Sequence, residues 1–229
     1  MEIHKAKAVH GWRELLNEVG VIVIGVVIAL TGEQAAEALH WRHTVHLTRE
    51  SLSRDLSEDL SNAADLRAFG ACDKAYLDLL ESAIVENRTA AIEGLRKLGP
   101  PAHRSPWVDG AWKAALGGDV ANHLNRDELS EYALAFGQVS TEFQLMFQIT
   151  DHYAEALAGP FGPAAGPQVM HDQLAAIRKI RSDQAVRLAV AGYLLDQRAP
   201  RLKVAPDKTR VANAARKAAA CESAVKALL

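Results

Sequence analysis

One acid and three histidines stand at a spacing that could bind a metal ion. They lie three residues apart in a stretch expected to be helical: Glu37, His40, His43 and His46. Neighbours three positions apart can share a helix face, and imidazole and carboxylate groups bind zinc or copper. Each step turns the helix by about 300°, so His40 and His46 end up about 120° apart and cannot join one coordination sphere.

We therefore expect this histidine ladder to be solvated or interfacial, and we expect no cofactor. Two functional alternatives stay open for it. One pair of neighbours could bind a metal ion, or the ladder could sense pH, because imidazole titrates near pH ~6.5.

The sequence holds no motif of the common catalytic or nucleotide-binding sites. Gly-x-Ser-x-Gly, Gly-x-Gly-x-x-Gly and the P-loop are all absent. Acidic residues are numerous, but a general acid–base pair also needs a pocket and a shifted pKa, which a sequence does not reveal. We predict that the protein is not an enzyme.

Cys72 and Cys221 are the two cysteines of the chain. In an exported domain they would form one bridge, which closes a loop of about 150 residues and contributes roughly 4–5 kcal/mol in the chain-entropy model. In a reducing compartment they would be separate thiols that pack as small apolar side chains. The choice depends on the compartment, and therefore on the N-terminal segment.

An apolar segment near the N-terminus predicts a membrane anchor. Val19–Gly32 carries no charge, and flanking leucines and alanines extend it to about 22 residues, enough for a hydrocarbon core of roughly 30 Å. Trp12 and Trp41 lie just outside its ends, as interfacial aromatic side chains do. Three basic residues precede the segment and two follow it, which favours a cytoplasmic N-terminus. They are Lys5, Lys7 and Arg13, then Arg42 and Arg49.

These observations predict a cytoplasmic tail over 1–14, a transmembrane helix over 15–38 and a helical exported domain over 39–229. Glu18 and Glu33 must then lie at the two interfaces or be covered by partners. Two alternatives stay open: a signal peptide cleaved near Ala36-Glu37-Ala38, and a helix buried in the protein's own core.

Small residues recur on one face of the predicted anchor. They stand at spacings of four, three and four: Gly25, Ala29, Gly32 and Ala36. Such a stripe lets two membrane helices approach closely, although small residues are common in apolar segments. A homodimer through the N-terminal helix is therefore one expected partnership, beside the lipid bilayer and an unidentified protein.

The run from Trp12 to Gln34 resembles the start of a family of uncharacterised bacterial single-pass inner-membrane proteins. It reads W-R-E-L-L-N-E-V-G-V-I-V-I-G-V-V-I-A-L-T-G-E-Q, and the family shares its Glu-Val pair and Gly-Val-x-Ile-Ala-Leu run. A looser likeness covers Ala111–Leu124. The resemblance implies an inner-membrane protein with a periplasmic helical domain, and it implies no activity. Thr31 and Glu33 depart from the family pattern.

Helical periodicity continues beyond the anchor. Gly70 is expected to kink or end the first long helix, before a second stretch over 71–87. Residues 88–106 are expected to be a connector, and 107–116 a short helix ending at two glycines. A heptad-like row predicts the buried stripe of the first helix: Val45, Leu52, Leu56, Leu60, Ala63 and Leu66.

The clearest pattern follows Asn125, which with Glu128 suits a capping box. A seam of alternating three- and four-residue spacings then predicts packing along other helices: Leu129, Tyr132, Phe136, Val139, Phe143, Met146, Thr150, Tyr153 and Leu157. The Gly- and Pro-rich stretch 159–167 must be a loop. We expect a helix over 168–198, with Leu174, Ile177, Leu188, Ala191 and Leu195 inward, and a last helix capped by Asp207. The fold class is all-α, with a transmembrane helix running into a long helix packed in a bundle of four or five.

Charge is unevenly distributed. Residues 178–229 hold 12 Lys or Arg and 4 Asp or Glu, whereas the whole chain has a formal net charge of −2. We expect the basic helices to pack beside the acidic first helix, and no nucleic acid to bind. The leading hypothesis is thus a membrane-anchored scaffold or interaction module. The alternatives are a periplasmic sensor of pH, metal or a small molecule, and a soluble protein that binds nucleic acid through the basic third.

Overall fold

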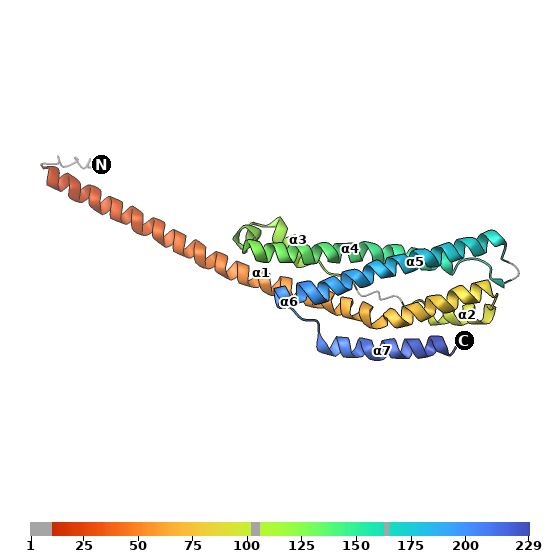
Figure 1. Ribbon diagram of the computed structural model, residues 1–229. Coiled ribbons are helices and arrows are strands. Elements are labelled where there is room, and N and C mark those ends of the chain that lie inside the picture. The colour runs from red at the N-terminus through yellow and green to blue at the C-terminus, as the bar shows by residue number, and fades with distance from the viewer. Residues whose placement is uncertain (1–10, 102–105, 163–164) are drawn as a thin grey trace, which may run out of the picture. The chain divides into compact units, whose positions relative to one another are not determined.

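The computed structural model describes residues 11–101, 106–162 and 165–229. The predicted all-α class is confirmed, since the described residues form helices and no strand. The chain separates into two compact units, residues up to Leu47 and Thr48–Leu229. Figure 1 shows the elements in chain order.

The elements are mostly long helices. They are α1 (Trp12–Val85), α2 (Thr89–Leu98), α3 (Gly110–Gly117), a 3-10 turn (Asp119–His123), α4 (Arg126–Ala156), α5 (Pro167–Tyr193), a π-helical turn (Leu194–Arg198), α6 (Ala199–Leu202) and α7 (Lys208–Lys226).

The α1 helix has no break at Gly70, contrary to the expected kink or end. A Cβ at Gly70 would meet only Leu188, at an ordinary distance of 3.6 Å. The predicted stripe from Val45 to Leu66 is confirmed, because all six of its side chains are buried. Their burial outweighs the roughly 1 kcal/mol that a glycine costs inside a helix.

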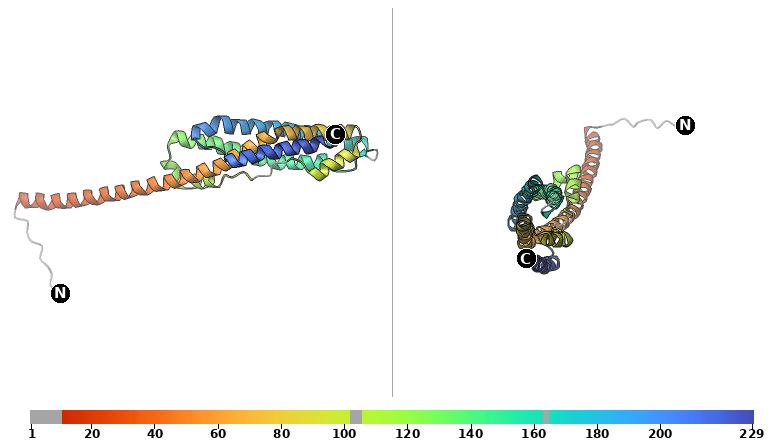
Figure 2. Two further views of the ribbon diagram at one scale, coloured as in Figure 1. Left: turned by 90° about the horizontal axis from the view of Figure 1, so that it is seen from below. Right: turned by 90° about the vertical axis from the view of Figure 1, so that its right-hand side faces the viewer.

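The core of the second unit draws residues from five helices. Tyr76 and Leu80 of α1, Ile92 of α2, Tyr153 of α4 and Ile177 of α5 are each at most 3% exposed, and Val225 of α7 joins them. Figure 2 shows these helices running lengthwise beside one another within residues 48–229. Each helix thus buries one face in a shared interior.

The expected connector over 88–106 is wrong in its first half, which forms α2. The helix forms because Ala91, Ile92 and Leu95 share one face and are buried in the core. Two local signals for it are present as well, since Arg96 and Lys97 lie in its last turn and Gly99 follows its end.

The predicted cap of α4 is confirmed in part. Asn125 accepts from the backbone N–H groups of Asp127 and Glu128, at 2.9 and 3.4 Å. The Glu128 carboxylate instead accepts three hydrogen bonds from Arg49 on α1, at 2.8, 3.0 and 2.6 Å. Asp207 caps α7 as expected, by accepting from the N–H of Arg210 at 2.9 Å.

The predicted seam of α4 is wrong in its middle. Tyr132, Phe136 and Val139 are buried as expected, but Phe143 is 46% exposed while Glu142 beside it is 0% exposed. The expected inward face of α5 is wrong at Leu188, which is 40% exposed. The neighbouring Arg187 is buried in its place, at 4% exposed, as Glu142 is in place of Phe143 on α4.

Glu142 and Arg187 turn inward because they pair with each other. Arg187 Nε donates to Glu142 Oε2 at 2.9 Å. Removing one partner from such a buried pair leaves an uncompensated charge, whereas an apolar pair of similar volume is tolerated.

We expect Arg187→Met to lower the free energy of unfolding by roughly 3–5 kcal/mol, because Glu142 then loses its partner. The double variant Glu142→Leu/Arg187→Met should recover most of that loss. Denaturant titration of the full chain in detergent micelles measures both.

Arg181→Met is the matched control, since Arg181 pairs with Asp78 and Glu81 on the surface. Its cost should stay below about 1 kcal/mol. A similar loss for Arg187→Met and Arg181→Met would contradict a special role for the buried pair.

Candidate functional site

The apolar segment of α1 is exposed on every side in the first unit. Its large side chains are 48–66% exposed, over Val19, Val21–Ile24, Val26–Ile28 and Leu30. An 18-residue window of this helix has a mean hydropathy of 2.2, and none of that window is buried. By length and composition the helix can cross a membrane. A helix that is apolar all round needs a nonaqueous surrounding.

Thr31, a polar residue at the end of the apolar segment, is satisfied within the helix. Thr31 Oγ1 donates to the carbonyl oxygens of Val27 and Ile28, at 2.8 and 3.0 Å. The hydroxyl therefore needs no external partner, and a threonine paired in this way is tolerated among apolar residues.

The histidine ladder does not converge. His40, His43 and His46 are all exposed along α1. Glu37 accepts from Trp41 Nε1 at 3.4 Å, and the His40 ring lies edge-on to Trp41 with centroids 5.5 Å apart. Within the part of the chain that the structure describes, no three His, Cys, Asp or Glu side chains are grouped so that they could hold a metal ion.

The small-residue stripe lies on the same exposed part of α1. Gly25, Ala29, Gly32 and Ala36 are all exposed, and a Cβ added at Gly25 or Gly32 would meet no atom within 4 Å. Association through this stripe stays a prediction.

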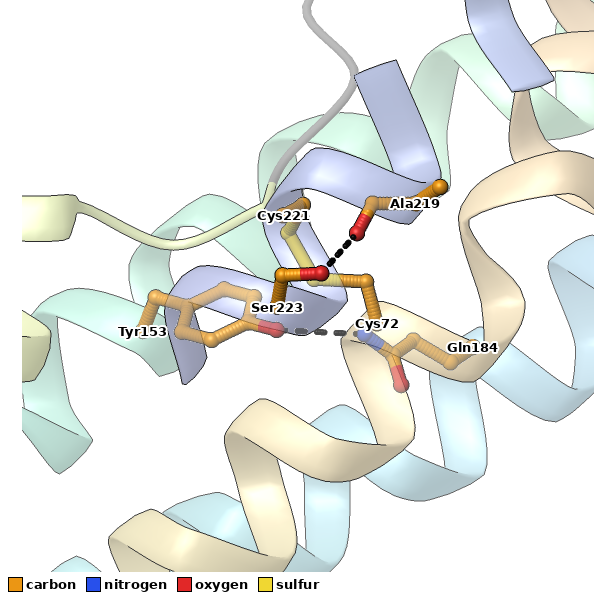
Figure 3. Close-up of a disulfide and its surroundings, with 6 residues drawn as sticks. All are labelled: Cys72, Tyr153, Gln184, Ala219, Cys221 and Ser223. Carbon is orange, nitrogen blue, oxygen red and sulfur yellow. Dashed lines mark hydrogen bonds between the residues drawn. A yellow bond between two sulfur atoms is a disulfide. The ribbon is translucent and has the colours of Figure 1, made fainter. Parts of the chain in front are cut away.

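Cys72 and Cys221 form a disulfide between α1 and α7, with Cα atoms 5.9 Å apart. Figure 3 shows the bridge beside Tyr153 and Gln184, whose side chains are hydrogen-bonded at 3.1 Å. The bridge joins residues 149 positions apart in the sequence. It therefore ties the last helix to the first.

Sequence reasoning missed two buried carboxyl groups near Arg187. Asp73 is 8% exposed, and burial raises its pKa to about 7 although the nearby Arg187 charge opposes the rise. Burial also raises the pKa of Glu142, against the effect of Arg187. One oxygen of Glu142 and one Nη of Arg187 are buried without a hydrogen-bond partner.

A sequence signal for this pair did exist. Glu142 is the only charged residue from Tyr132 to Thr150, and Arg187 is the only one between Asp183 and Asp196. A single charge inside a long apolar stretch of helix indicates a buried, paired group.

Asp59 is the second buried acid of α1. It accepts from the Val108 N–H at 2.8 Å, and its other oxygen is buried without a partner. Burial raises its pKa to about 8, and the neighbouring charges of Asp55, Glu58 and Asp109 add to the rise. This carboxyl holds the segment before α3 against α1.

None of these acids lines the pocket at the far end of α1. That pocket is lined by Ile84, Val85, Asn87, Phe161, Gly162, Ala165, Pro167, Met170 and Gln173. Gln173 donates to the Ala158 carbonyl at 2.7 Å, and its Oε1 is buried without a partner. The acids thus hold helices together, away from this opening.

The basic C-terminal third pairs with acids of α1 and α4. Arg210 contacts Asp65 at 3.4 Å and also binds Asn62. Arg198 and Arg201 both bind Glu131, at 2.5 and 3.0 Å. These contacts neutralise part of the positive charge of this region within the chain itself.

Comparisons with protein families, with curated proteins and with solved structures found no match.

The raised pKa of Asp59 makes stability depend on pH. Because the folded state keeps this proton up to about pH 8, whereas an unfolded carboxyl releases it near pH ~4, the folded state binds more protons in between. The free energy of unfolding should therefore fall as pH rises from about 4 to 8.

We expect Asp59→Asn to reduce this fall by more than about 1 kcal/mol between pH 5.5 and 8.5. Denaturant titrations of the full chain in micelles at both pH values give the difference. Asp151→Asn, which changes an exposed acid of α4, controls for the loss of charge. An equal pH dependence in the wild type and Asp59→Asn would contradict this assignment.

We expect no reactive thiol when protein from an oxidising compartment is denatured without reductant, and two after reduction. Dithiobis-nitrobenzoate titration of the full chain measures this. Cys221→Ser should then expose one thiol and destabilise the chain by roughly 2–5 kcal/mol. Two reactive thiols before reduction would rule out the bridge.

Proposed function

We propose that this chain is a single-pass protein of the bacterial inner membrane. In this proposal the helix over 15–38 is the anchor, residues 1–14 are cytoplasmic, and 39–229 form a periplasmic bundle of four or five helices. The bundle acts as a scaffold or interaction module rather than as an enzyme.

One observation carries the proposal. The charge-free stretch of α1 is exposed around its whole circumference, whereas the stripe from Val45 onward is buried. A helix in the core of its own chain would be buried on at least one face. Transfer of apolar surface out of water contributes about 25 cal/mol per Å², so exposure of nine aliphatic side chains to water is unfavourable. Lipid tails would surround this helix with apolar groups on all sides.

The disulfide supports a periplasmic location for the second unit. Bridges persist in oxidising compartments and are rare in the cytosol. The bridge joins α1 to α7, so it needs both cysteines on the same side of the membrane. Both cysteines follow the single proposed span, so they would lie on the same side of the membrane.

Two further features agree with retention of the anchor. Trp12 and Trp41 flank the apolar stretch, and Trp12 is 73% exposed, as a residue of the membrane interface would be. The α1 helix also runs unbroken through Ala36-Glu37-Ala38, where a signal peptide would be cleaved.

A sensor function is the second candidate, because Gln173, which lines the pocket at the far end of α1, has a buried side-chain oxygen without a hydrogen-bond partner. A small molecule that raises the melting temperature of the wild type but not of Gln173→Leu would favour it.

We expect the full-length protein to stay with membranes through carbonate and high-salt washes. The double variant Ile24→Arg/Ile28→Arg should be largely released, because each arginine near the bilayer centre costs roughly 2.5–3.5 kcal/mol on insertion. Fractionation followed by immunoblotting measures both.

Leu39→Arg/Leu47→Arg is the matched control, since both leucines are exposed on α1 beyond the proposed span. Its retention should equal that of the wild type. A wild-type chain that is monomeric and soluble without detergent would overturn the proposal.

A further inference from the structure

We propose that the pocket at the end of α1 binds a neutral molecule the size of one ring, which donates a hydrogen bond to Gln173. The pocket lies where the end of α1, the loop between α4 and α5 and the start of α5 meet. Side chains from all three line it: Ile84 and Val85, Phe161, and Met170 and Gln173. The inference deepens the second candidate function, sensing, and rests on it.

Gln173 offers a hydrogen-bond acceptor that the chain itself does not use. Its side chain is 2% exposed, and its Oε1 is buried without a partner. Its Nε2 donates to the carbonyl oxygen of Ala158 at 2.7 Å. Flipping the amide would set two oxygens against each other there, so the unused atom is the oxygen. A buried acceptor without a partner is unfavourable, and a donor bound in the pocket would satisfy it.

The lining side chains favour a neutral organic ligand over an ion or a water molecule. None of the nine described lining residues is charged, and burial of an unpaired charge is strongly unfavourable. A buried water molecule needs two to four polar partners. Among these nine residues only Gln173 and Asn87 have polar side chains, and Asn87 is exposed. A ligand with an apolar body and one donor therefore fits.

The volume of the pocket limits this ligand to about one ring. The cavity measures about 190 Å³, whereas a protein cavity of ~150 Å³ holds one benzene molecule. A ring with one small substituent matches this space. Phe161 and Met170 suit such a ring, because aromatic groups and thioethers pack favourably against aromatic rings.

The loop side of the pocket is held in place by its own contacts. The guanidinium of Arg96 lies over the ring of Phe161, 5.4 Å from its centroid. Gly159 and Gly162 have φ values of 86° and 77°, which glycine adopts without strain. A Cβ at Gly162 would come within 2.9 Å of Thr89 Cγ2, so the loop packs closely against the start of α2. A pocket that is formed beforehand needs little rearrangement to bind.

The test compares phenol with toluene, in which a methyl group replaces the hydroxyl. Isothermal titration of the full-length chain in detergent micelles measures the dissociation constants of both. We expect Gln173→Leu to lower the preference for phenol by about tenfold or more, because leucine offers no acceptor. All variants are titrated in the same micelles, so uptake of the probes by detergent cancels. An unchanged preference would overturn the inference, as would a wild type that does not bind phenol.

Gln168→Leu is the matched control, since it makes the same chemical change on α5 outside the pocket. Gln168 is exposed, and its Nε2 donates to Asp172 at 2.9 Å. Its preference for phenol should equal that of the wild type, and an equal loss in Gln168→Leu and Gln173→Leu would overturn the inference. Thermal unfolding within a few degrees of the wild type shows that each variant is folded.

Met170→Trp tests the place of binding while Gln173 stays unchanged. The larger side chain fills the pocket, so phenol should bind about tenfold more weakly or worse. Unchanged affinity would place phenol elsewhere and overturn the inference.

The outcomes separate this inference from the functions proposed above. Equal binding of phenol and toluene that Met170→Trp abolishes would retain a ligand pocket, and with it the sensor function, but would overturn the bond to Gln173. Absence of binding by either probe would count against both. Carbonate extraction of the same chain tests the anchor separately.

Discussion

The backbone of α1 stays helical while the chemistry of its side chains changes along its length. Every N–H and C=O inside such a helix is bonded within the helix itself, so the backbone tolerates either lipid or a protein core around it. The side chains therefore decide the surroundings. Around Val19–Leu30 they are apolar on all sides and exposed, and from Val45 onward many of them are buried. The exposed apolar segment and the buried positions thus belong to one continuous helix.

The second unit holds its remaining helices to α1 with interactions of different kinds. Apolar burial supplies the shared core, and the disulfide ties α7 to α1. Polar contacts position the rest: Asp59 binds the backbone at Val108, and Glu142 and Arg187 join α4 to α5. Buried charges contribute less net stability than apolar packing would, but they penalise any register in which they lose their partners. They therefore select one arrangement of these long helices.

Several errors of the sequence reasoning have one cause. Periodicity identified α4 and its cap at Asn125, and it identified the stripe of α1 from Val45 to Leu66. The same periodicity assigned Phe143 and Leu188 to the interior, where the structure instead places Glu142 and Arg187. A periodic pattern reports which positions share a face of one helix. It does not report where along that face a neighbouring helix ends, or where two opposite charges on different helices form a buried pair. The α2 helix was missed although the spacing of Ile92 and Leu95, the basic last turn and the glycine that follows are local signals of a helix.

By itself, the sequence determined the helical class, the place and length of the apolar segment, and the capped starts of α4 and α7. These properties depend on residues within a few turns of one another, so the local order of side chains is sufficient. Only the tertiary structure decided that Cys72 lies 5.9 Å, Cα to Cα, from Cys221, that Asp59 and Asp73 are buried, and that Phe143 and Phe147 remain exposed. Each of these facts depends on how segments far apart in the chain pack against one another.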